Sequence, residues 1–128
     1  MLPRPYRLTR SDEYKRVQRG GRSRAHPLLI LVSAPNGGDM VRVGLTVGKK
    51  VGGAVARNRA KRLLREAVRL YLSRIAPGHD IVLVGRPETP GAGREAVAAA
   101  LGQLLQRSGL LIRGVVKTAM ADMAGKDG

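Results

Sequence analysis

The segment from residue 54 to about residue 75 constrains the fold most, because it is apolar along one side and basic along the other. Its apolar residues recur at the i, i+3, i+4, i+7 spacing of an amphipathic helix. At 100° per residue they cover an arc of about 140°. The stripe comprises Ala56, Ala60, Leu63, Leu64, Ala67, Val68, Tyr71 and Ile75. The spacing predicts one long helix that buries this stripe and exposes its basic side.

Shorter elements are predicted on both sides of this helix. Ser11, followed by two acidic residues, indicates a helix start, and Gly20 with Gly21 ends that helix. A second amphipathic helix is expected over residues 93–108. The expected strands cover residues 28–34, 41–47 and 81–84. Residues 35–39 read as a hairpin connection. The pattern favours an α+β fold, a sandwich with a single sheet.

Two of these strands carry further information. Residues 81–84 are all apolar, which indicates a strand that is central or covered on both faces. The strand over residues 41–47 alternates, so only one of its faces is buried. Gly44 lies on its other, polar face, where the missing side chain would let a ligand approach the backbone.

The charge of the chain is concentrated in two segments. The sequence has 24 Lys and Arg residues against 9 Asp and Glu, a net charge of +15. Residues 1–24 hold eight basic and two acidic residues, and residues 49–74 hold nine basic residues and one acidic residue. A surface that is charged only for solubility mixes both signs. Such concentration indicates a polyanionic partner, most often a nucleic acid.

Several function classes are disfavoured by what the sequence lacks. It has no Cys, which excludes disulfides and thiolate metal sites. Its longest purely aliphatic run is five residues, 28–32, so we expect a soluble, cytoplasmic protein. The carboxylates form no D-x-D or E-x-x-H group, and His26 and His79 are far apart. We therefore expect neither a catalytic site nor a metal site in the protein itself.

The long helix carries a local conflict that points to function. Like charges stand four residues apart at 57 and 61, 61 and 65, and 65 and 69. Arg57 and Arg59 also lie near the positive end of the helix dipole. Bound phosphates would relieve both penalties, since they favour helix N-termini and pair with guanidinium groups.

Residues 42–66 closely resemble the signature of the bacterial ribonuclease P protein subunit, with Arg57-Asn58-Arg59 at its core, followed by Lys61-Arg62 and Arg65. The segments 11–14 and 80–87 resemble that family's opening helix and last strand. The resemblance runs from about residue 7 to residue 108. It leaves 109–128 as a C-terminal extension of a single RNA-binding domain, with an end, 124–128, that we expect to be disordered.

The resemblance implies an αβββαβα fold, with the long basic helix crossing between strands. It implies the protein component of ribonuclease P, which binds the catalytic RNA subunit and the 5′ leader of precursor tRNA, so that the endonuclease removes the leader. The RNA and its bound Mg²⁺ would carry the hydrolysis. The implied partners are this RNA and precursor tRNA, with no membrane and no obligate protein partner.

The resemblance also assigns residues to two surfaces. The RNA-subunit set is Arg57, Asn58, Arg59, Lys61, Arg62, Arg65 and Arg69. The leader set, in a cleft between the first helix and the sheet, is Tyr14, Gln18, Val32, Thr46, Lys49, Lys50 and Arg86. Gln18 and Val32 stand where the family commonly has aromatic residues. Stacking is worth about 1–3 kcal/mol per base, so we expect this chain to hold the leader more by charge.

Alternatives remain open at this level. A ribosomal or other structural RNA-binding protein would share the fold and composition. A DNA-binding regulator would need a short helix just before the basic one, where residues 41–47 indicate a strand instead. A protein-only nuclease would need clustered carboxylates. Tyr14 could also pack inward beside Val17 rather than contact the leader.

Overall fold

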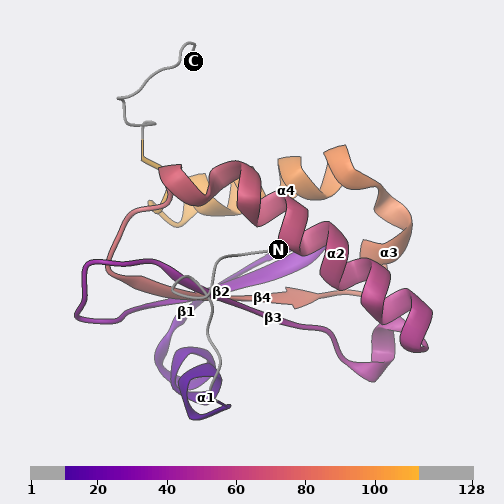
Figure 1. The fold of residues 1–128 in the computed structure, drawn as a ribbon, viewed down its shortest axis with the longest axis horizontal. Helices are drawn as coiled ribbons and strands as arrows, with labels where there is room; N and C mark the ends of the chain where they lie inside the picture. The colour runs from indigo at the N-terminus through magenta and orange to yellow at the C-terminus, as the bar shows by residue number, and fades with distance from the viewer. Residues whose placement is uncertain (1–10, 113–128) are drawn as a thin grey trace.

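The computed structural model describes residues 11–112 and contains one four-stranded sheet with helices on both faces (Figure 1). The strands are β1 (Arg22–His26), β2 (Leu29–Pro35), β3 (Arg42–Thr46) and β4 (His79–Gly85). The helices are α1 (Ser11–Gly20), α2 (Ala54–Tyr71), α3 (Thr89–Ala92) and α4 (Arg94–Arg107), with 3-10 turns η2 (Lys49–Val51) and η3 (Leu72–Arg74). The expected opening at residue 7 and the C-terminal end fall outside the described residues.

The order of elements agrees with the expected αβββαβα, with α3 as one additional turn. The strands lie in the order β1-β2-β4-β3, and β4 pairs antiparallel with β2 and parallel with β3. The long helix α2 is therefore the crossover that connects two parallel neighbours. The all-apolar strand is central, as its composition predicts.

The hairpin expected at residues 35–39 is wrong. β2 and β3 are not neighbours, because β4 lies between them and pairs with both. The loop instead passes over the beginning of β4, at the residue that precedes this strand. Asn36 donates its backbone N–H to the Gly78 carbonyl at 2.9 Å, and Gly78 donates its own to the Met40 carbonyl at 3.1 Å. The turn residues were recognised, but the strand inserted between β2 and β3 comes from a distant part of the chain.

The main core lies between the sheet and the layer formed by α2 and α4 (Figure 1). The predicted stripe of α2 supplies five buried residues, Ala60, Leu63, Leu64, Ala67 and Val68. The two helices approach closely at Gly102, where a side chain would overlap the Tyr71 hydroxyl group, 2.5 Å away. The stripe therefore fixes which side of α2 remains exposed.

A smaller cluster holds α1 on the opposite face of the sheet. It consists of Val17, Val32, Ala34 and Val82, with Tyr14, Ile30 and Val84 at its margin.

No helix among residues 11–112 is long and apolar enough to cross a membrane.

Candidate nucleic-acid interface

The outer side of α2 carries the basic residues that the sequence singled out. Asn58, Arg59, Arg62 and Arg69 are exposed, and Arg57, Lys61 and Arg65 are half-buried beside the stripe. The buried stripe faces the sheet, so these side chains share the remaining surface of one helix. Nothing acidic interrupts this surface except Glu66, the only acidic residue of α2. The helix can thus present several cations to one phosphate backbone.

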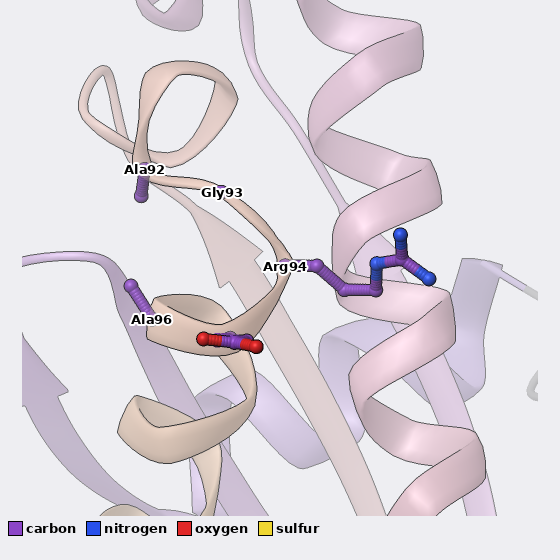
Figure 2. Close-up of a pocket in the computed structure, with 5 residues that line it drawn as sticks. Ala92, Gly93, Arg94 and Ala96 are labelled. Atoms are coloured by element: carbon purple, nitrogen blue, oxygen red, sulfur yellow. The ribbon is translucent and has the colours of Figure 1, made fainter.

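The start of α4 adjoins this basic side. The Nε of Arg59 donates a 2.6 Å hydrogen bond to the Pro90 carbonyl of α3. Arg94 extends from the start of α4 towards α2 (Figure 2), and its Nε lies 3.8 Å from a carboxylate oxygen of Glu66. Arg94 is a cation of this surface that the sequence motif did not include. Arg59 is exposed to solvent and is also hydrogen-bonded to α3.

On the other face of the sheet, Tyr14 lies directly over Gly44. A side chain at Gly44 would stand 2.5 Å from Cζ of the Tyr14 ring. The expectation that a ligand makes the close approach at Gly44 is therefore corrected: the tyrosine ring of α1 fills that space. Tyr14 is half-buried, so it packs against the sheet and still keeps part of its surface exposed.

Beyond α1 the sheet offers a half-exposed row of side chains. Ile30, Val84 and Thr46 are direct cross-strand partners on β2, β4 and β3. The next row, Val32, Val82 and Gly44, lies beneath α1.

Val32 is only 7% exposed, so it supports this surface from below and does not form part of it. Sequence reasoning did not identify Ile30 and Val84 as residues of this surface. Each lies two residues along its strand from Val32 or Val82, so its side chain is on the same face of the sheet. Strand alternation alone could have found them.

Three cations lie past this row, where β3 and β4 end. β3 and β4 are parallel, so the segments that follow them leave the sheet at the same end. Lys49 and Lys50 follow β3 in η2 and are exposed, and Arg86 follows β4 and is half-buried. Gln18 is exposed one helical turn after Tyr14. An aromatic ring and a half-exposed row therefore share one face of the sheet, and three cations follow the strands at one end of it.

The turn that carries Arg86 is fixed by Thr89. The Thr89 hydroxyl accepts a hydrogen bond from the Arg86 backbone N–H at 2.9 Å and donates one to the Leu28 carbonyl at 2.5 Å. Thr89 is fully buried. These bonds hold the start of the turn against the start of β2.

A fully buried carboxylate, Asp80, lies at the opposite end of the same face. It accepts hydrogen bonds from Nε and an Nη of Arg42 at 2.9 and 2.8 Å, from the Asn36 amide at 2.9 Å, and from Arg16 of α1. Burial alone would raise the pKa of Asp80. The hydrogen bonds from Arg42 and Asn36, with the charges of Arg42 and Arg16, outweigh burial and hold that pKa below its ordinary value of 3.8. Sequence reasoning did not identify Asp80, because nothing local marks its partners.

Among the side chains of residues 14–112, no three of His, Asp or Glu gather in a way that could hold a metal ion. The exposed cations of α2 and the half-buried Tyr14 ring have the chemistry that binds phosphates and bases.

Comparisons with known proteins agree with this geometry. The sequence matches the family model described as Ribonuclease P over residues 2–109. It is 41% identical to the ribonuclease P protein component of Roseiflexus castenholzii, covering 98% of this chain and 100% of that protein. It is 43% identical to that of Chloroflexus aurantiacus, covering 86% and 82%.

Two solved structures are similar to this fold. The Staphylococcus aureus RNase P protein has a TM-score of 0.75 at 27% identity, over 83% of this chain and 97% of that one. The Thermotoga maritima RNase P protein has a TM-score of 0.71 at 30% identity, over 79% and 96%. The chain therefore belongs to the ribonuclease P protein family, the protein subunit that accompanies the RNA of this endoribonuclease in tRNA 5′ maturation.

Proposed function

We propose that the protein uses two separate surfaces, one for the RNA subunit and one for the 5′ leader of precursor tRNA. The observation that carries this proposal is the placement of α2 and α1 on opposite faces of one sheet (Figure 1). A rigid sheet between them lets the protein hold the RNA subunit with one side and the substrate with another.

The RNA-subunit surface is the exposed side of α2. Its contacts are assigned to Arg57, Asn58, Arg59, Lys61, Arg62, Arg65 and Arg69. Guanidinium groups pair with phosphate oxygens through two parallel hydrogen bonds. Arg94 lies beside this set, and we include it as a further phosphate contact because Arg94 is highly exposed and reaches α2.

The leader surface runs from α1 to the segments that follow β3 and β4. Tyr14 offers a ring edge or face for a base, and Gln18 and Thr46 offer polar groups. The leader phosphates that extend past this row would meet three cations, Lys49, Lys50 and Arg86. Tyr14 is the single aromatic residue that the described part of the chain, residues 14–112, places on this surface, so we expect less binding energy from stacking than from charge.

Hydrolysis is assigned to the RNA subunit and the Mg²⁺ that it binds. In the part of the chain with described side chains, residues 14–112, no group of three His, Asp or Glu could hold a metal ion, and we assign no catalytic residue to the protein. We place the protein in the cytoplasm with its RNA and precursor tRNA, as one RNA-binding domain that needs no other protein.

Reconstitution tests this proposal. The purified chain, combined with a bacterial ribonuclease P RNA at low Mg²⁺, should cleave precursor tRNA at the mature 5′ end. The same RNA alone should be much slower, and the protein alone should be inactive at every Mg²⁺ concentration. Cleavage that survives rigorous removal of RNA and disappears in a point variant of the protein would contradict the assignment.

A further inference from the structure

We propose that Asp80 is a positioning residue for the leader surface: through Arg16 it fixes the rotation of α1 about its own axis, and so places Tyr14 over β3. This inference rests on the leader surface proposed above. Asp80 would contact neither RNA nor substrate, but it would determine the orientation of the α1 side chains on the leader surface.

Asp80 connects four segments that are distant in the sequence. It lies on β4 and is bound by Arg16 of α1, by Asn36 of the loop after β2, and by Arg42 of β3. Arg16 also donates to the Pro35 carbonyl at the end of β2, at 3.3 Å. The carboxylate is fully buried, whereas the Arg16 side chain is 47% exposed. Arg16 is thus the polar tie from α1 to this buried centre.

The need for such a tie follows from how little else anchors α1. Among the side chains described in this helix, from Tyr14 onward, Val17 alone is fully buried. The half-buried Tyr14 ring adds a second apolar contact on one side of Val17, and neither contact restrains the other side of the helix. At 100° per residue, Tyr14 lies about 60° to one side of Val17 and Arg16 about 100° to the other. A bond at Arg16 therefore sets the position of the flank that carries Tyr14 and Gln18.

Stability alone does not account for a buried carboxylate here. Asp80 is the second residue of β4 and directly precedes four apolar residues. An apolar side chain would fit this buried position as well. Replacing a buried ion pair by well-packed apolar residues is often neutral or stabilising. What an apolar residue does not supply is a directional bond to α1. The direction matters because the Tyr14 ring lies so close to Gly44 that a side chain added there would displace it.

The test compares variants of the full chain assembled with the RNA subunit. Arg16→Ala removes the tie from α1 and leaves Asp80 bound to Arg42 and Asn36. Lys15→Ala is the matched control, because it removes the same charge from an exposed position on the same helix. Asp80→Asn is the second variant, and Arg16→Lys is the conservative one. The measurements are the affinity for precursor tRNA relative to mature tRNA, and hydrogen exchange of the α1 amides.

We expect Arg16→Ala and Asp80→Asn to reduce the preference for precursor on the order of tenfold, close to the loss from Tyr14→Ala. Exchange in α1 should rise in the same two variants, while assembly with the RNA subunit is unchanged. Lys15→Ala should leave exchange unaltered and lower affinity only slightly. Arg16→Lys should recover part of the preference, since an ammonium group can still reach the carboxylate.

The outcomes separate this inference from the proposed function. If Tyr14→Ala lowers the preference for precursor but Arg16→Ala and Asp80→Asn match Lys15→Ala, the positioning role is wrong and the leader surface stands. If Tyr14→Ala has no effect either, the leader surface is wrong and the positioning role fails with it. A variant that unfolds would show faster hydrogen exchange throughout the sheet. If only such variants lose the preference for precursor tRNA, Asp80 acts on stability alone and the inference is overturned.

Discussion

At the scale of single residues, the contact between Tyr14 and Gly44 links the fold to the proposed leader surface. The ring belongs to α1 and the glycine to β3, so the contact joins two elements that border the proposed leader surface. The missing side chain at Gly44 admits the protein's own aromatic group. The sequence marked both residues, but only the folded chain shows that they meet.

Gly44→Ala should displace the Tyr14 ring. The added methyl group meets the far end of a side chain that can rotate away, so we expect a loss of about 1 kcal/mol in the free energy of unfolding, at the low end of overpacking costs. Precursor affinity should fall as it does in Tyr14→Ala. In the Tyr14→Ala background the same substitution should have little further effect, which a double-mutant cycle measures. Additive losses would show that the two residues act independently.

At the scale of elements, the sequence predicted what hydrophobic periodicity encodes and missed what depends on pairing. The stripe of α2 and the apolar strand β4 were both visible in the sequence. β1 was not apparent from its own residues, because they are almost all exposed and three of the five are Arg or His. Only the family resemblance implied a third strand before α2.

The candidate site shows the same division. The motif on α2 could be recognised because its residues are close in sequence. The row of Ile30, Val84 and Thr46, and the partners of Asp80, depend on the strand order β2-β4-β3. Local patterns do not determine that order, since a hairpin between β2 and β3 satisfied the same turn signals.

The basic side of α2 should dominate the salt dependence of assembly. Counterion release gives about −0.7 to −0.9 in the log–log slope per phosphate neutralised. With at least six basic side chains on this helix, we expect a slope of about −4 or steeper for binding of the RNA subunit. Arg62→Ala should reduce the slope by about one unit without affecting the fold, because Arg62 is exposed and no side chain of residues 14–112 is seen to pair with it.

Arg59→Ala is the informative comparison for that variant. It should also weaken assembly, but it removes the hydrogen bond to Pro90 as well, so some of its effect should appear as a lower melting temperature. A slope near −1 for the unaltered protein would mean that α2 is not the contact surface.

At the scale of the whole molecule, the sheet separates the two proposed surfaces. The larger core fixes α2 on one face, and the smaller cluster with the Asp80 ties fixes α1 on the other. Because no part of α2 takes part in the α1 cluster, damage to one surface should leave the other intact. The proposed function depends on this separation of the two surfaces.

Precursor affinity measured against leader length tests this claim most directly. Holoenzymes carrying wild-type protein, Tyr14→Ala or Arg62→Ala are titrated with precursor tRNAs of decreasing leader length and with mature tRNA. The Tyr14→Ala defect should amount to about 1–3 kcal/mol with long leaders and disappear once the leader is too short to reach α1. The Arg62→Ala defect should appear in assembly with the RNA subunit and be independent of leader length. A Tyr14→Ala protein with a markedly lower melting temperature, impaired equally on precursor and mature tRNA, would contradict the account.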